Sequence, residues 1–269
     1  MEEQLLLPVE NGSLFAVLYT PASAIRATAL FFDPLLEERK TSQRPLVELA
    51  RRLAEANVAV LRFDYGGCGD SSGDFAATSL RSMTCDALAA HAWLETRFPG
   101  IPRWLFGLRC GGALALSMAT AAAKHERPYG LVLWEPVLDG HEYIMAELRK
   151  KLMKEMMTFG GNRTTREEMV RRLEEEGTVD LDGYPLTGTL FSEVASLRLN
   201  SELDDEPAQH VFHASISPSA GKKGETDHAG SGCAVSTMHF RMQSFWNQVG
   251  YVDCSHLIEE TVSWLARLL

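Results

Sequence analysis

Apolar residues in the first half of the chain follow two alternating patterns, which together predict alternating strands and helices. Short apolar runs predict strands, and apolar positions three and four residues apart predict helices. The predicted strands are residues 5–9, 13–19, 27–32, 58–63, 104–108 and 129–134. The predicted helices are residues 45–56, 79–97 and 110–123. This alternation favours a mostly parallel sheet with helices on both sides, the α/β class.

The second half of the chain departs from this rhythm. Residues 139–205 are expected to be helical throughout, as a lid inserted between two strands, because the stretch is too short and amphipathic for a core of its own. The expected elements of this half are helices at 141–158, 166–176, 189–197 and 255–269, strands at 211–216 and 237–243, and a loop at 217–236. We therefore expect residues 1–269 to form a single domain with a sheet of about eight strands.

Composition and charge exclude several classes of function. The formal net charge of -10 disfavours binding to nucleic acid or to an anionic membrane surface. The acidic N-terminus does not look like a signal peptide, and no apolar run approaches the ~20 residues that span a bilayer. The five cysteines are scattered without metal-site spacing. We expect a cytoplasmic protein with reduced thiols and with neither metal nor cofactor.

A glycine-rich segment, residues 62–71, follows the predicted strand at 58–63. Its glycines allow a sharp turn beside the carboxyl edge of a sheet, where α/β folds place their ligands. The segment is typical of the fold, and we interpret most of it as a structural turn without a catalytic role.

A second motif carries more of the chemistry. Residues 106–112 read Phe-Gly-Leu-Arg-Cys-Gly-Gly at a strand-to-helix junction. Small residues two before and two after the apex have the spacing of a nucleophile elbow, in which a strained turn lifts the apex side chain into a pocket. Gly107 and Gly111 occupy those positions, so the residue at the apex is Arg109.

With these motifs in view, the chain resembles the α/β hydrolases and, more narrowly, the type 2 hydrolases associated with the exosortase A system. The narrower resemblance rests on residues 32–39, 61–75, 107–109, 133–137, 183–186, 245–246 and 257–258. It implies an α/β-hydrolase fold and a bacterial cytoplasmic protein linked to exopolysaccharide and protein-sorting systems, with a possible protein partner there. It does not supply a known reaction. We expect a hydrolase of ester or thioester bonds with weak activity.

Arg109 cannot itself be the nucleophile, because a guanidinium with a pKa above ~12 has no free lone pair at neutral pH. In one interpretation Cys110 is the nucleophile, activated by the helix N-terminus and by Arg109. His256, before the last helix, and Asp227 would then complete the usual order of nucleophile, acid and histidine. Cys110 lies one position past the apex, however, and Leu108 two residues before it is not small.

Two other interpretations of Arg109 stay open. The elbow can bind a carboxylate or phosphate through Arg109 and the backbone N–H groups that begin the helix. Alternatively, Arg109 pairs with an internal acid and Cys110 is a buried structural thiol. The candidate acids lie near strand ends and are Asp33, Glu37, Asp64 and Glu135.

For either binding or catalysis, we expect a pocket between the lid and the carboxyl edge of the sheet, facing a small-molecule ligand. It would be bordered by residues 33–36, Arg109, Cys110 and His256. The expected substrate-binding residues are Arg109, Asp33, Pro34, Leu35 and Gly111.

The predicted lid is rich in methionine, with residues 145, 153, 156, 157 and 169. Methionine-rich surfaces can hold flexible apolar ligands, but such a stripe is more often the face with which a helix packs. We therefore expect these side chains to contribute to the core.

Overall fold

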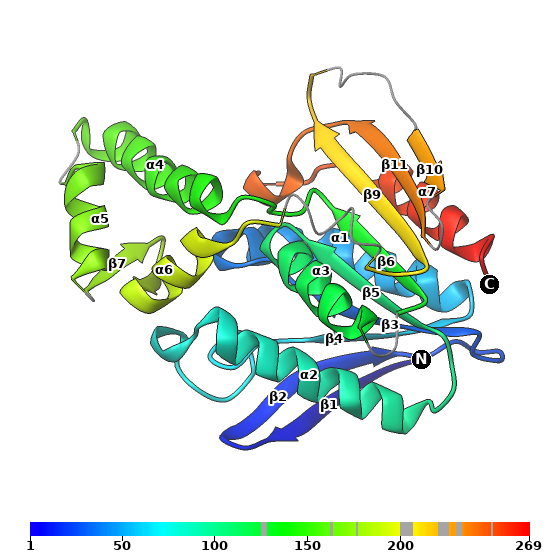
Figure 1. The fold of residues 1–269 in the computed structure, drawn as a ribbon. Coiled ribbons are helices and arrows are strands. Elements are labelled where there is room, and N and C mark those ends of the chain that lie inside the picture. The colour runs from blue at the N-terminus through cyan, green and yellow to red at the C-terminus, as the bar shows by residue number, and fades with distance from the viewer. Residues whose placement is uncertain are drawn as a thin grey trace.

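A computed structural model describes residues 1–124, 128–161, 164–175, 177–199, 207–219, 226–229, 233–248 and 250–269. Its centre is a twisted sheet of nine described strands in the order β1-β2-β4-β3-β5-β6-β9-β11-β10 (Figure 1). The run from β4 to β11 is parallel, whereas β1, β2 and β10 pair antiparallel with their neighbours. The strands are β1 Glu2–Val9, β2 Gly12–Tyr19, β3 Ala27–Phe32, β4 Val58–Phe63, β5 Arg103–Leu108, β6 Gly130–Trp134, β9 His210–Ser217, β10 Thr226–Ala229 and β11 Ala234–Arg241.

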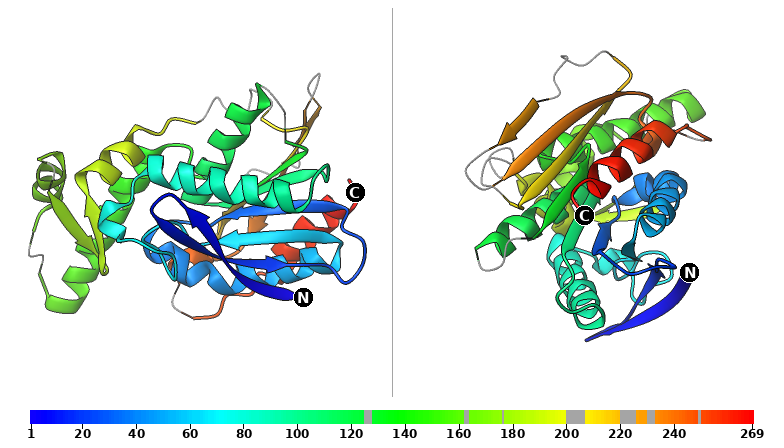
Figure 2. Two further views of the ribbon diagram at one scale, coloured as in Figure 1. Left: turned by 90° about the horizontal axis from the view of Figure 1, so that it is seen from below. Right: turned by 90° about the vertical axis from the view of Figure 1, so that its right-hand side faces the viewer.

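Helices cover both faces of this sheet (Figure 2). Alternate residues of β3 show why, since Leu30 and Phe32 belong to one buried cluster and Ala29 and Phe31 to the other. A strand whose two faces are both buried reads as a continuous apolar run. The first cluster contains residues of α2 (Leu80–Arg97) and α3 (Cys110–Ala123), and the second contains residues of α1 (Leu36–Glu55) and α7 (Ser255–Ala266).

The first half of the chain matches the predicted alternation closely, with one error in α1. This helix begins at Leu36, well before the predicted start at residue 45, and it contains Pro45. Proline is favoured in the first turn of a helix, which is why the pattern suggested a start there. The helical turns that the prediction omitted carry the buried residues Leu36, Glu38 and Ser42. The prediction therefore missed the burial of Glu38, which belongs to the candidate site.

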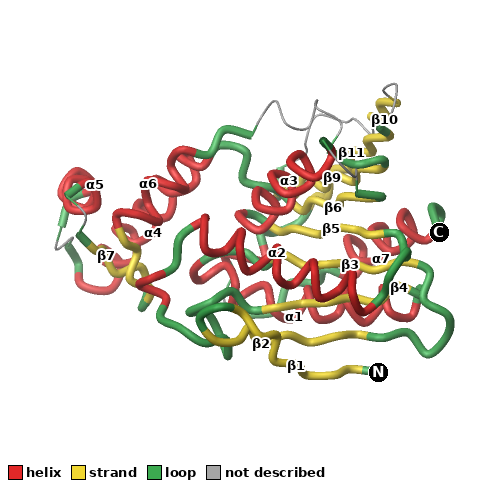
Figure 3. Tube along the Cα trace, turned by 60° about the horizontal axis from the view of Figure 1, so that its bottom comes forward, coloured by secondary structure: helices red, strands yellow, loops and turns green. Residues whose placement is uncertain are grey.

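The inserted segment projects beyond one end of the sheet (Figure 3). It contains α4 (Gly140–Phe159), α5 (Arg166–Glu174) and α6 (Gly188–Ser196), as the pattern predicts, but also an antiparallel hairpin of β7 (Thr178–Leu181) and β8 (Tyr184–Thr187). The expectation of helix throughout is therefore wrong. Asp182 and Gly183, with φ of 55° and 90°, form the turn. Asp-Gly is a strong signal for a two-residue hairpin with positive φ at both positions.

Two other expectations change in the C-terminal half. The predicted loop at 217–236 includes strand β10, while residues 220–225 and 230–232 of that prediction lie outside the described residues. Two short 3-10 helices, η1 (Phe75–Ala77) and η2 (Phe245–Asn247), were not expected. No helix within the described ranges is long and apolar enough to cross a membrane.

The methionines of the insertion divide into two groups. Met169 is buried, but Met153, Met156 and Met157 on the distal half of α4 are 59%, 49% and 85% exposed. The expectation of core packing is wrong for these three residues. The distal half of α4 extends past the sheet, so the body of the protein does not cover that face of the helix (Figure 1).

Candidate functional site: the elbow and its buried ion pair

Arg109 lies at the apex of a strained turn between β5 and α3. Its backbone has φ 55° and ψ -121°, which is rare for a residue with a side chain. The flanking glycines are required because the backbone segments almost touch. A Cβ on Gly107 would lie 2.5 Å from the Gly111 carbonyl oxygen, and one on Gly111 would lie 2.1 Å from that of Phe32. The turn therefore has the geometry of a nucleophile elbow.

The Arg109 side chain points into the protein and is 18% exposed. Its Nε donates to Glu38 Oε1 at 3.3 Å, and Nη1 donates to the backbone oxygen of Glu135 at 3.3 Å. The guanidinium also lies 5.5 Å from the ring centre of Tyr143 and 5.1 Å from that of Trp246. Aromatic faces attract a cation at such distances. The arginine thus has a carboxylate, a carbonyl and two aromatic rings around it.

Glu38 is not among the acids expected to pair with Arg109. Each expected carboxylate has another partner: Asp33 binds Arg62, Glu37 binds Lys40, Asp64 binds Arg39, and Glu135 accepts the N–H of Ile216. Because α1 was expected to begin at residue 45, the sequence did not indicate which of Glu37 and Glu38 faces the elbow. With the helix starting at Leu36, Glu38 shares its buried face with Ser42 and Pro45.

Glu38 is fully buried at a junction of three helices. Besides Arg109 at the start of α3, it receives the Tyr143 hydroxyl at 3.3 Å and lies 3.7 Å from Lys150 Nζ, both on α4. Burial raises the pKa of Glu38 above its ordinary value, and Glu147 adds to this, although Arg109 and Lys150 act in the opposite direction. Burial lowers the pKa of Arg109, but Glu38 more than offsets this, so Arg109 stays charged.

Cys110 is 0% exposed behind the elbow. Burial raises its pKa to about 12; Glu38 contributes to the rise and Arg109 opposes it. A cysteine nucleophile reacts as the thiolate, and this environment stabilises the neutral thiol. The predicted catalytic role of Cys110 stays a prediction that its position does not support.

The other two members of the predicted triad lie on α7 and β10. His256 is exposed in the first turn of α7, with its ring 5.5 Å from that of Phe240, and in the described part of the chain no hydrogen bond joins it to Cys110. Asp227 pairs with Ser236 in strand β10 at the edge of the sheet, and its side chain lies outside the described residues. Their roles as base and acid are untested predictions.

Most of the residues that were expected to border a pocket above the sheet edge are buried. Asp33, Pro34, Leu35 and Gly111, the expected neighbours of a substrate, are all buried. Asp33 is held by Arg62 at 3.1 Å and by Gln43 at 3.3 Å, as an internal group. A hollow of about 840 Å³ lies between α1 and strands β1, β2 and β4, and Arg109 does not line it. Of the ion pair at the elbow, the Arg109 side chain is partly exposed, at 18%, whereas that of Glu38 is 1% exposed.

Comparisons with known proteins agree with this geometry. The sequence model of the family described as serine aminopeptidase, S33, matches residues 40–177, just over half of the chain. Lysophosphatidylserine lipase ABHD12 of Gallus gallus is 34% identical over 91 residues, which are 34% of this chain and 23% of that protein. The chain thus spans about a quarter of the length of that relative.

Solved structures resemble the whole chain. A lipase in its open form has a TM-score of 0.64 at 18% identity and covers 100% of this chain and 99% of its own. Est1E of Butyrivibrio proteoclasticus with bound ferulic acid has a TM-score of 0.63 at 14% identity and covers 98% and 96%. At these identities the likeness concerns the fold, and the predicted α/β-hydrolase fold is confirmed.

The geometry of the elbow predicts that alanine substitution at two glycines will have very different effects on folding stability. Gly107→Ala should destabilise the protein by about 1–3 kcal/mol, because a new methyl group would meet backbone atoms that cannot rotate away. Gly161→Ala is the matched control, since nothing lies within 4 Å of a Cβ there. Urea unfolding of both variants measures the effect. Equal stability of the two variants would contradict the close approach at the elbow.

Proposed function

The chain belongs to the serine aminopeptidase, S33, family, and from this premise we propose that its elbow binds an anionic group without forming a covalent bond to it. One observation carries the proposal. A guanidinium stands at the apex where this fold places a nucleophile, and it faces a buried carboxylate. In this interpretation Glu38 occupies the place that a carboxylate or phosphate of the ligand would take.

The elbow offers an anion more than Arg109. The first hydrogen bond of α3 runs from the Ala113 N–H to the Arg109 carbonyl at 3.2 Å, so the N–H groups of residues 110–112 precede the intrahelical ladder. Free N–H groups and the helix dipole both favour negative charge at this end. Lys150, 3.7 Å from Glu38, adds a second cation near the same point.

Glu38 is held loosely enough to be exchanged. Its contacts with Arg109, Tyr143 and Lys150 are 3.3, 3.3 and 3.7 Å long. Charge-assisted hydrogen bonds of full strength are about 2.7–2.9 Å long. For a ligand to reach the buried position of the Glu38 carboxylate, either α4, which carries Tyr143 and Lys150, or Trp246 of η2 has to move. An entering anion would then replace Glu38 beside the guanidinium.

Arg109→Gln tests this binding. Calorimetric titration with acetate, benzoate and inorganic phosphate should show saturable binding to the wild type and at least roughly tenfold weaker binding to the variant, because a charged partner is lost. Trp246 emission should change during the wild-type titration, since its ring lies 5.1 Å from the guanidinium. The control is Arg103→Gln, since Arg103 is a similarly half-buried arginine that pairs with Glu95 at the opposite end of β5. Anion binding that survives in Arg109→Gln, or no binding to the wild type, contradicts the proposal.

Glu38 also predicts a pH dependence of stability. Its pKa is raised from an ordinary value of 4.5, so the folded protein keeps this proton to a higher pH than the unfolded chain does. The stability that Glu38 contributes by keeping this proton is fully present below pH 4.5 and is lost as the pH rises through the pKa of the folded protein. The melting temperature of the wild type should fall between about pH 4 and pH 8, a span that begins near the ordinary carboxyl pKa. The melting temperature of Glu38→Gln should fall less over the same span.

The charged and titratable groups around Glu38 are Arg109, Cys110, Tyr143, Glu147 and Lys150. Glu37→Gln is the control, since that carboxylate is exposed and pairs with Lys40. Glu38→Gln should also bind acetate more tightly than the wild type at neutral pH, because the internal competitor has lost its charge. The same pH profile in wild type and Glu38→Gln would assign the fall to other groups.

Membership of a hydrolase family favours a second candidate, hydrolysis of ester or thioester bonds, with Cys110 as nucleophile and His256 and Asp227 as base and acid. The buried thiol leads us to expect that a thiol-directed reagent labels the exposed Cys85 and not Cys110 in the native protein. We also expect that Cys110→Ala does not reduce whatever turnover of an acyl-ester panel the wild type shows. Labelling or turnover lost in Cys110→Ala but kept in Cys85→Ala would favour the second candidate.

The resemblance noted above supports a cytoplasmic setting in a bacterial exopolysaccharide or sorting system. A protein partner there would be recovered by affinity capture with the intact chain. Arg109→Gln, used as bait in parallel, would show whether the elbow contributes to that contact.

A further inference from the structure

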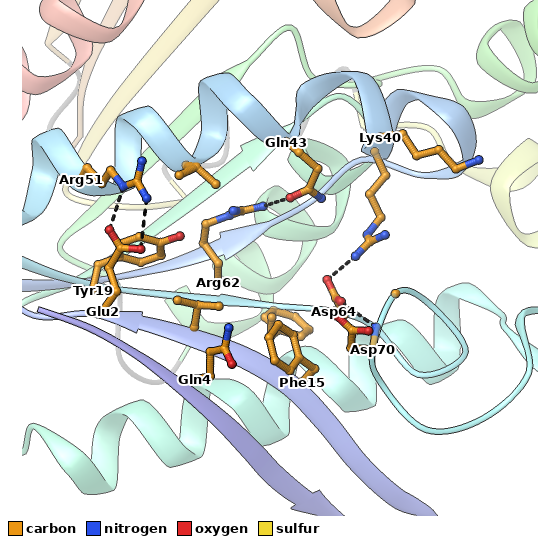
Figure 4. A pocket seen from close by; sticks show the side chains of 15 residues that line it. Glu2, Gln4, Phe15, Tyr19, Lys40, Gln43, Arg51, Arg62, Asp64 and Asp70 are labelled. Carbon is orange, nitrogen blue, oxygen red and sulfur yellow. Dashed lines mark hydrogen bonds and ion pairs between the residues drawn. The ribbon is translucent and has the colours of Figure 1, made fainter.

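The hollow of about 840 Å³ beside α1 is separate from the elbow and is lined by different side chains (Figure 4). It lies between one face of α1 and the neighbouring face of β1, β2 and β4, and we call it the hairpin groove. Its volume falls within the range of about 300–1,000 Å³ that small-molecule sites occupy. Glu38 is directed from α1 to the elbow, whereas Gln43, Val47 and Arg51 of the same helix line the groove.

The groove exists because α1 covers only part of the sheet. Leu46, Leu49 and Leu53 of α1 lie in the buried cluster with β3 and β4. The sheet twists, so the β1–β2 hairpin turns away from the helix. Phe15 and Val17 of β2 are left half-buried on the floor of the groove, facing Val47. An uncovered apolar floor inside a hollow favours the apolar part of a ligand.

One part of the groove is built from two guanidinium groups around a phenol. Arg62 is 7% exposed and interrupts the otherwise apolar strand β4. It donates to Asp33 at 3.1 Å and to Gln43 at 2.9 Å. Burial lowers the pKa of Arg62, but Asp33 and then Tyr19 more than offset this. Tyr19 also interacts with Arg51, so the phenol neighbours both arginines.

The partner of Arg51 is well suited to exchange. Arg51 binds the Glu2 carboxylate through Nε at 2.7 Å and Nη2 at 3.2 Å, a fork that fits any carboxylate or phosphate. The two side chains are 56% and 45% exposed, and such surface pairs contribute little stability. The lining as a whole has four cationic and three acidic side chains, although the chain carries a net charge of -10. Each of these cations is already paired with an acid of the chain, so an anionic ligand must displace Glu2 at Arg51.

We propose that the hairpin groove binds an elongated anionic amphiphile, a molecule with a carboxylate or phosphate on an apolar body. The anionic group replaces Glu2 at Arg51, beside Arg62 and Tyr19. The apolar body lies over Val17, Phe15 and Val47. This site does not depend on the proposed function of the elbow, because no residue that lines it contacts Arg109 in the described contacts.

Calorimetric titration with octanoate tests the site, with octyl phosphate to compare the two anionic groups. In Arg109→Gln, where the elbow does not contribute, octanoate should bind, whereas acetate, which lacks the apolar body, and octanol, which lacks the charge, should bind at least about tenfold more weakly. Arg51→Gln should weaken octanoate binding by roughly tenfold, since a charged hydrogen-bonding partner is lost. Val47→Trp should abolish binding by filling the groove.

Two controls separate this site from its surroundings. Arg52→Gln alters the next residue of α1, which pairs with Glu55 outside the groove, and should leave octanoate affinity unchanged. In Arg109→Gln, which removes the anion site proposed at the elbow, the octanoate binding that depends on Arg51 should remain. Glu2→Gln should tighten octanoate binding, because it removes the negative charge that competes for Arg51. Glu2 is exposed, so this variant keeps the test valid even if Val47→Trp does not fold.

Several results would overturn the proposal. Absence of octanoate and octyl phosphate binding would show that the groove holds no such ligand. Equal binding of octanol would remove the role of the arginines, and equal binding of acetate would remove that of the apolar floor. Octanoate binding that is lost in Arg109→Gln but kept in Arg51→Gln would assign the ligand to the elbow.

Discussion

Arg109 and Glu38, 71 residues apart in the chain, form an ion pair inside the protein, and the surroundings of the elbow follow from it. Removing two charges from water costs more than a single long contact returns, so further partners are needed. Tyr143 and Lys150 of α4 reach Glu38, while the carbonyl of Glu135 accepts from Arg109. The pair thereby fixes where α1, α3 and the inserted segment meet, and it closes the space in which hydrolases of this fold hold a substrate.

Ion pairs of this kind recur at the carboxyl ends of neighbouring strands of the sheet. Asp33 follows β3 and binds Arg62, Asp64 follows β4 and binds Arg39, and Arg109 follows β5 and binds Glu38. Helix α1 takes part on both of its sides, since it supplies Glu38 to the elbow and Arg39 and Gln43 to the hairpin groove. Acids and cations at this edge neutralise one another internally, so an external anion must compete with a carboxylate of the chain at either place.

Local patterns predicted most elements of the fold well. The bounds of β3, β4 and α3 agree with the sequence-based expectation because continuous apolar runs and flanking glycines act over a few residues. The hairpin of β7 and β8 was missed although Asp182-Gly183 is a recognisable turn, since the amphipathic helices around it set the interpretation of the whole segment. The early start of α1 was missed because Pro45 resembles a first helical residue.

The sequence by itself determined the α/β class, the elbow and the residue at its apex. Glycine spacing and strand-to-helix order are local, and they leave Arg109 no other position. Only the tertiary structure decided that Glu38 pairs with it, that the Cys110 thiol is buried at 0% exposure, and that the His256 side chain is exposed. Partner choice and burial depend on which distant segments pack together, and a desolvated guanidinium binds the carboxylate that packing brings to it, however far away in sequence that residue lies.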